Sequence, residues 1–391
     1  MNYIYGEQKQ KEILSLAMEL IKIPAISVGR FKNPEGVVKC FEFIVAYLKK
    51  AGLRVIELKD KESVPALYCD LQTQKELSGS ILFAGHYDRV SPISETQMVP
   101  FIEGEWLKAR GATDMLCTVA TLMVLFKDLK LENKKINCGL ILVGNEESGE
   151  TERWGTPFIL EELYKTTNYQ PDFVIVAERT GEGDVCLGRL EYKNRGLIRI
   201  KIGASGSAEH TAQLKGLTAL ERIMEFRNRI FEYFSRPSES EWKTTFTFPY
   251  FLSGEIGNFN TTPTVAWAGL EVRPIPEENI EKIITHITEL GKQFDLSIEY
   301  INKEPGITTP LKNSFLQSLL QILATFGGGK IDDYLGKGKI HATQARFIKS
   351  PVVILGQSGI NPHGAHEAHY IPSIMPYYHL MREFLSFCGS A

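Results

Sequence analysis

Continuous apolar runs of strand length, separated by helix-like segments, constrain the fold of this chain more than any other feature. The runs lie at residues 66–68, 81–84, 139–143, 173–177 and 352–355. Around and between them, apolar residues recur at helical spacing at 8–22, 37–50, 115–128 and 374–387. Strands that do not alternate must be buried on both faces. We therefore predict an α/β domain whose mostly parallel sheet is covered by helices.

The pattern changes in the middle of the chain, which at 391 residues is too long for one ordinary core. Residues 198–202 alternate apolar and charged side chains, as in a strand with one exposed face. Similar strands are predicted at 244–248, 265–270 and 296–300, with helices at about 217–234 and 277–293. We expect a catalytic domain of residues 1–184 and 306–391, interrupted by a smaller α+β domain of residues 185–305.

Charge and cysteine content exclude several classes of protein. A formal net charge of -3 gives no excess that would attract nucleic acid or an anionic membrane. The sequence contains no apolar stretch of about 20 residues and no signal-peptide pattern at its start. Its six cysteines are scattered without a C-x-x-C pair, which argues against a disulfide framework or a thiolate zinc site. We expect a cytoplasmic protein with reduced thiols.

Side chains suited to metal binding follow the predicted strands at their carboxyl ends, where the functional groups of open α/β sheets collect. They are His86, Asp88, Asp114, Glu146, Glu147, Glu178 and His363. Taken singly, each of these residues is more often structural. Their shared position at strand ends, or directly before a helix for Asp114, favours one common site.

The residue types also fit one chemistry. Histidines and carboxylates without cysteine suit zinc, or a similar divalent ion, in an open catalytic site. A carboxylate that bridges two ions lets both lower the pKa of one water molecule. Adjacent Glu146 and Glu147 can divide the tasks of proton acceptor and metal ligand. Asp88 can hold His86 in the tautomer that binds metal.

As an ordered set, these segments resemble the signatures of the dizinc acyl-amino-acid deacylase and exopeptidase family. This family includes succinyl-diaminopimelate desuccinylase, acetylornithine deacetylase, aminoacylase and glutamate carboxypeptidase. The resemblance covers nearly the whole chain and rests on Gly85-His86-Tyr87-Asp88-Arg89-Val90, Gly111-Ala112-Thr113-Asp114-Met115, Glu146-Glu147, Glu178 and His363-Gly364-Ala365-His366-Glu367. It implies a zinc-exopeptidase-like catalytic domain and an inserted lid and dimerisation domain.

The resemblance also implies a role for each residue. Two divalent metal ions are expected, zinc or the substitutes cobalt or manganese. One ion would be bound by His86 and Glu178 and the other by Glu147 and His363, with Asp114 bridging them. Glu146 would be the general base, and Asp88 would orient His86. The peptide bond between Asp114 and Met115 is expected to be cis.

Parts of the inserted domain resemble the family's lid. His210 stands where a lid histidine reaches the active site of a second subunit, which implies a homodimer. Asn260 and Arg273 match lid positions that bind substrate oxygens, for which the arginine fork is well suited. Arg346, outside the lid, is either a further substrate contact or part of a structural ion pair. The chain departs from the usual family residues at Leu214, Thr218, Gln344 and His366.

The resemblance therefore implies a metal-dependent amidohydrolase of linear amides in amino-acid metabolism. It would remove an acetyl- or succinyl-type acyl group from an N-acyl amino acid. A di- or tripeptidase or carboxypeptidase of the same family is the alternative, because it would use the same metals and residues. A non-catalytic binding protein on this fold is a third hypothesis, and the intact Glu146 argues against it. We expect no nucleic-acid or membrane partner.

Overall fold

The computed structural model describes residues 2–59, 64–71, 81–149, 155–234, 241–341 and 343–390. Its internal contacts divide the chain into two compact units. The larger consists of Met1–Tyr192, Thr309–Lys339 and Thr343–Ala391, and the smaller of Lys193–Thr308 with Ile340–Ala342. The divisions predicted from the sequence lie near residues 184 and 306. Each unit has its own cluster of buried apolar side chains.

The larger unit is built on a six-stranded sheet in the order β17-β9-β4-β8-β3-β2. The first four strands run parallel: β17 (Val352–Ile354), β9 (Phe173–Val176), β4 (Ile81–His86) and β8 (Cys138–Val143). The last two strands pair antiparallel to their neighbours: β3 (Pro65–Asp70) with β8, and β2 (Arg54–Lys59) with β3. Every residue of β4 and β8 is buried, so both faces of the sheet are covered. The predicted α/β class with a mostly parallel sheet is confirmed.

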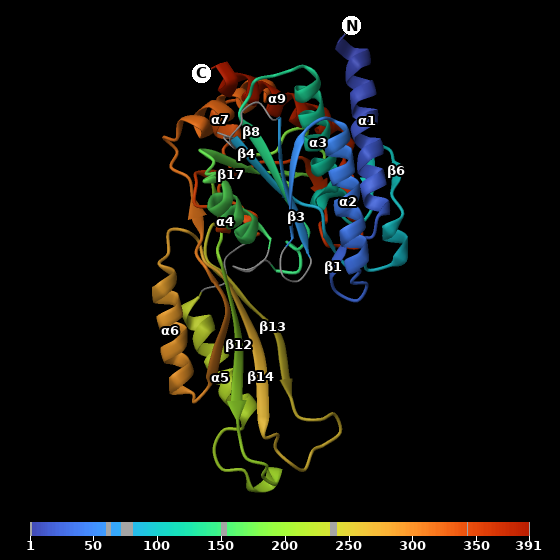
Figure 1. Cartoon of the computed structure of the whole chain (residues 1–391). Helices are drawn as coiled ribbons and strands as arrows, with labels where there is room; N and C mark the ends of the chain where they lie inside the picture. The colour runs from blue at the N-terminus through green and yellow to red at the C-terminus, as the bar shows by residue number, and fades with distance from the viewer. Residues whose placement is uncertain are drawn as a thin grey trace. The chain divides into compact units, whose positions relative to one another are not determined.

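Six long helices surround this sheet (Figure 1). They are α1 (Asn2–Lys22), α2 (Pro34–Lys50), α3 (Cys117–Leu131), α4 (Thr156–Thr167), α7 (Ser314–Gly327) and α9 (Ile374–Ser390). The helix α2 begins where Asn33 accepts a hydrogen bond from the backbone of Gly36, directly before Pro34. Nearly all of α3 is buried, and it contacts both α1 and α9. These contacts explain why α3 is apolar on all sides.

Short strands that the sequence did not predict bring distant segments of the larger unit together. Five of them form a second sheet: β10 (Gly181–Glu182), β18 (Ser358–Ile360), β19 (Ala368–Tyr370), β7 (Trp106–Lys108) and β6 (Phe101–Glu103). Another pair, β1 (Ile26–Val28) and β5 (Arg89–Val90), runs parallel. Pairing of β19 with β7 places the loop that carries His363 next to the segment that carries Asp114.

The smaller unit has a four-stranded antiparallel sheet in the order β13-β14-β12-β15. Its strands are β13 (Thr245–Ser253), β14 (Val265–Arg273), β12 (Leu197–Ser205) and β15 (Ser297–Glu304). The helices α5 (Ala219–Tyr233) and α6 (Ile280–Gln293) pack on it and complete the core. A short pair, β11 (Lys193–Asn194) and β16 (Ile307–Thr308), adjoins the points where the chain enters and leaves the unit. This is the α+β organisation that the alternating strands predicted.

Two simpler expectations can be compared with the structure. All six cysteines are free, and Cys40, Cys69, Cys117 and Cys138 are buried, as expected for reduced thiols. Within the described part of the chain, none of the helices combines the length and apolar character needed to cross a bilayer.

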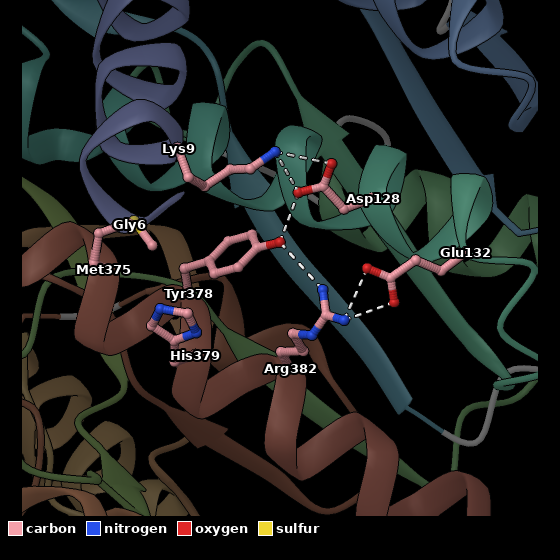
Figure 2. Close-up of a pocket in the computed structure, with 8 residues that line it drawn as sticks. All are labelled: Gly6, Lys9, Asp128, Glu132, Met375, Tyr378, His379 and Arg382. Carbon is pink, nitrogen blue, oxygen red and sulfur yellow. Dashed lines mark hydrogen bonds and ion pairs between the residues drawn. The ribbon is translucent and has the colours of Figure 1, made fainter. Parts of the chain in front are cut away.

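A polar cavity of about 630 Å³ lies where α1, α3 and α9 meet (Figure 2). Asp128 accepts a 2.6 Å hydrogen bond from the Tyr378 hydroxyl and lies 2.8 Å from Lys9 Nζ. Arg382 donates to both carboxylate oxygens of Glu132. Because these charged groups bind one another, we interpret the cluster as a set of polar contacts that hold the three helices together. It lies far from the start of α3, since Asp128 is eleven residues beyond Cys117, a rise of about 17 Å along the helix.

Replacing Tyr378 with phenylalanine is expected to destabilise the larger unit. The change removes a hydrogen bond to a charged acceptor, so the free energy of unfolding should fall by roughly 1–3 kcal/mol in chemical denaturation. Tyr47→Phe is a matched control, since the buried Tyr47 hydroxyl has no hydrogen-bond partner among the described residues. Its effect should stay within about 0.5 kcal/mol. Equal losses in the two variants would contradict the assigned role of Tyr378.

Candidate metal centre and active site

Among the described residues of the larger unit, two groups of three side chains lie close enough together that each could hold a metal ion, and they share Asp114. His86 Nε2 lies 3.2 Å from Asp114 Oδ1 and 3.2 Å from Glu178 Oε1. His363 Nε2 lies 3.1 Å from Asp114 Oδ2 and 3.0 Å from Glu147 Oε1. The two oxygens of Asp114 therefore face different histidines, as a bridging carboxylate requires. We call these groups the His86 trio and the His363 trio.

The sheet explains why these residues meet. His86 ends β4, Glu147 follows β8 and Glu178 follows β9, so three parallel neighbouring strands deliver them to the same edge. Asp114 comes from the turn Ala112–Leu116, which leads into α3 and leaves helical geometry at Asp114 and Met115. The peptide bond between these two residues is cis, as the resemblance implied.

The backbone of Gly111, which precedes this turn, packs closely against the side chain of Arg89. Gly111 has a φ of +82°, and a β-carbon there would lie 2.0 Å from Cδ of the buried Arg89. Arg89 in turn donates to the carbonyls of Ile21 and Arg110 at 3.0 and 2.9 Å. Only glycine fits this position, since it tolerates the positive φ and leaves room for the arginine.

The donor set fits divalent cations. Imidazole nitrogens and carboxylate oxygens, without thiolate, suit zinc and related ions in an open site. Burial and the charge of Asp114 raise the pKa of Glu147 to about 7. Hydrogen bonds to Asp114 and Glu147 raise the pKa of His363 to about 11. Carboxylates crowded in this way repel each other, and a shared cation would offset that repulsion.

Glu146 lies beside the trios rather than within them. Burial raises the pKa of this carboxyl well above its usual value, and the charges of Glu147 and Glu178 add to the shift, while His86 and Arg346 oppose it. Arg346 Nη1 lies 3.9 Å from Glu146 Oε1 and donates a 2.8 Å hydrogen bond to the carbonyl of Thr343. A carboxylate with a raised pKa is well suited to take a proton at neutral pH.

Asp88 connects the ends of β4 and β8. Its carboxylate accepts hydrogen bonds from the backbone N–H groups of Glu146 and Glu147 at 3.2 and 3.1 Å. His86 Nδ1 lies 3.1 Å from the Asp88 carbonyl oxygen and 3.4 Å from Oδ1. The Ser27 hydroxyl, from β1, donates to the same carboxylate at 2.5 Å. The sequence analysis identified Asp88 but not Ser27, because a single serine 61 residues before Asp88 belongs to no recognisable motif.

Two further residues were not recognised as part of the site. Arg110 and Glu367 form a buried ion pair of 2.6 Å between the segments that carry Asp114 and His363. Glu367 ends the motif that begins with His363, but nothing in the sequence assigned it a function. Arg110 belongs to none of the motifs that carry the family resemblance. The motif spacing placed both close to ligands, but their pairing depends on segments more than 250 residues apart.

Three of the predicted site residues lie in the smaller unit: His210, expected to be catalytic, and Asn260 and Arg273, expected to bind substrate. His210 is exposed, and its Nδ1 accepts a 3.2 Å hydrogen bond from the backbone of Ala212. Asn260 is exposed on the loop between β13 and β14. Arg273 Nε donates a 2.8 Å hydrogen bond to Glu271 on the same strand. The catalytic role of His210 and the substrate binding by Asn260 and Arg273 stay predictions.

The four departures from the family pattern occupy different environments. Thr218 caps α5, and its side chain and that of Glu221 bond each other's backbone. Leu214 ends the short turn after His210, and His366 is exposed. Gln344 is fully buried, and neither end of its amide has a partner among the described residues.

Comparison with known proteins places this geometry in a family. Residues 82–386 match peptidase family M20/M25/M40. Succinyl-diaminopimelate desuccinylase of Pelagibacter ubique is 27% identical over 386 residues, 91% of this chain and 93% of that protein. Acetylornithine deacetylase of Photorhabdus laumondii is 23% identical over 381 residues, 90% of each chain.

Solved structures show the same fold. Human carnosine dipeptidase 1 superimposes with a TM-score of 0.76 at 13% identity, over 99% of this chain and 98% of that one. The family match extends over well more than half of the sequence and includes the residues of both trios. This protein is therefore a hydrolase of the M20/M25/M40 peptidase family.

Proposed function

We propose that this protein is a dinuclear metal amidohydrolase that removes an acetyl- or succinyl-type acyl group from an N-acyl amino acid. The observation that carries the proposal is the pair of trios that share Asp114, with Glu146 beside them. The relatives named as a desuccinylase and a deacetylase resemble this chain in sequence over about nine-tenths of its length. Its likeness to the dipeptidase is one of fold, which favours deacylation over peptide hydrolysis.

The trios would hold two divalent ions, zinc or the substitutes cobalt or manganese, which would polarise the scissile carbonyl and activate a water molecule. Asp114 would give one oxygen to each position. Glu146 would accept the proton of the attacking water and deliver it to the leaving nitrogen. The water oxygen bonds to the carbonyl carbon and the C–N bond breaks, which yields a carboxylic acid and a free amine.

The substrate contacts can be ranked by their surroundings. The Arg346 side chain is only 4% exposed and already donates to the Thr343 carbonyl beside Glu146. These contacts favour a structural role near the base over direct contact with substrate. We propose that Asn260 and Arg273 contribute to substrate binding, and that His210 of a second subunit completes the catalytic site.

A direct test of the function compares two panels of substrates. Metal-reconstituted protein is offered N-acetyl and N-succinyl amino acids in one panel and di- and tripeptides in the other. We expect kcat/KM to be highest for an N-acyl amino acid. A preference for peptides would replace this proposal with the exopeptidase alternative. Hydrolysis of neither panel by a metal-loaded preparation would favour the binding-protein hypothesis.

Replacement of the adjacent glutamates separates base from ligand. Glu146→Gln keeps the shape and all metal ligands but cannot accept the proton, so kcat should fall roughly 10²–10⁴-fold with metal content unchanged. Glu147→Gln should lower the occupancy of one ion, and added metal should partly restore activity. Elemental analysis and steady-state kinetics measure both effects. Loss of metal in Glu146→Gln, with both ions kept in Glu147→Gln, would show that the roles are exchanged.

We also propose that the smaller unit forms a homodimer through β13. This strand lies at one edge of its sheet and exposes Tyr250, Phe251 and Leu252 at 40%, 37% and 60%. The opposite edge, β15, carries charged residues that discourage pairing, among them Glu299 and Lys303. A long apolar edge strand pairs readily with its own copy around a two-fold axis.

Sedimentation should therefore detect a dimer at micromolar concentration, and Leu252→Lys should shift it toward the monomer. A charge on β13 would have to be buried in the interface, which is unfavourable without a partner. Ile301→Lys is the matched control, because Ile301 is 61% exposed on β15 and should leave the dimer intact. A monomeric wild-type chain with full activity would refute the dimer without affecting the proposed chemistry.

A further inference from the structure

We propose that the Arg110–Glu367 ion pair is a positioning device for the His363 trio. It would set the affinity of that trio for its metal ion without touching the ion. The inference rests on the proposed two-metal site and goes beyond it, because neither residue is a ligand or a base. Both side chains are buried, with 1% and 0% exposure.

Glu367 holds the backbone of the bridging residue. Its Oε1 accepts hydrogen bonds from the N–H groups of Thr113 and Asp114 at 3.2 and 3.3 Å. Its Oε2 accepts a 2.6 Å hydrogen bond from Arg110 Nη1. One carboxylate thus restrains the turn that presents Asp114 and also fixes the guanidinium.

Arg110 extends the restraint to the histidine loop. Its Nη2 donates to the carbonyls of His363 and Gly364 at 2.9 and 3.1 Å. The planar fork lets one side chain bind Glu367 through one nitrogen and this loop through another. The network therefore joins the two ends of the His363 trio, Asp114 and His363, through buried and partly buried hydrogen bonds.

The loop needs such support because of its backbone. His363 has a φ of +64°, in the left-handed region that side chains other than glycine rarely adopt. Its imidazole is 51% exposed, so packing gives it little restraint. Gln97 adds a second clamp, since its Nε2 donates to the carbonyls of Gly364 and Ala365 at 2.9 and 3.0 Å.

The His86 trio is held by different contacts. His86 is fully buried at the end of β4 and lies next to Asp88, while Glu178 directly follows β9 and Ala177. Loss of the Arg110 contacts to the loop should therefore weaken one metal position far more than the other. A merely structural ion pair would lower stability without this selectivity.

The test is metal binding by the full chain, measured by calorimetric titration of the metal-free protein with Zn²⁺. Arg110→Lys keeps a positive charge opposite Glu367, but a single ammonium cannot reproduce the fork. The wild type should bind two ions. The variant should bind the ion of the His86 trio with unchanged affinity. It should bind the ion of the His363 trio about 10–100-fold more weakly. Gln97→Ala, at a more accessible position, should weaken the same ion if Arg110→Lys does not fold.

Two controls assign the effect. In a His363→Ala background, which leaves one ion bound, Arg110→Lys should not change the remaining affinity. Arg54→Lys alters the remote Arg54–Asp70 pair of β2 and β3 and should leave both ions unaffected. Equal weakening of both ions by Arg110→Lys, or none in either Arg110→Lys or Gln97→Ala, would overturn the inference while the two-metal proposal stands. A wild-type chain that binds no second ion would overturn both.

Discussion

Four carboxylates, from Asp114, Glu146, Glu147 and Glu178, lie close together at one edge of a buried sheet, and the burial of so many acidic groups is the constraint on which the site depends. Burial raises the pKa of both Glu146 and Glu147, and the charges of neighbouring carboxylates raise it further. His86 and His363 lie against these carboxylates and counter the repulsion, and the cations that the donor set fits would counter it further. The residues around the site therefore have electrostatic as well as structural tasks.

The scaffold divides these tasks between strands and loops. Parallel strands set the positions of His86, Glu147 and Glu178, because their register cannot change without moving buried side chains to the opposite face. Asp114 and His363 come from irregular turns, which the sheet alone does not fix. Polar contacts supply the missing restraint, because Glu367 accepts a hydrogen bond from the backbone of Asp114 and Arg110 donates to the carbonyl of His363. The groups proposed to break the bond are separate from those proposed to bind the substrate.

Long elements were predictable from the sequence, and short ones were not. The predicted helices at 8–22, 37–50 and 217–234 and the buried strands at 81–84 and 139–143 are confirmed, because their apolar periodicity extends over enough residues to be distinctive. Strands of two or three residues, such as β18 and β19, have no periodicity and exist only through their partners. The helices α4 and α7 were missed between these better-defined segments.

The sequence by itself determined the fold class and the types of the candidate ligands, because the pattern of apolar runs and the motifs at their ends encode them, while the cis bond after Asp114 was implied by the family resemblance. Only the tertiary structure decided which side chains hold the candidate ligands and their backbone in place. Ser27 meets Asp88 across 61 residues, and Arg110 meets Glu367 across 257. Contacts of such sequence separation leave no local pattern, since each partner alone has the composition of an ordinary loop or strand end. They depend on a folded sheet that brings the segments together and excludes water from between them.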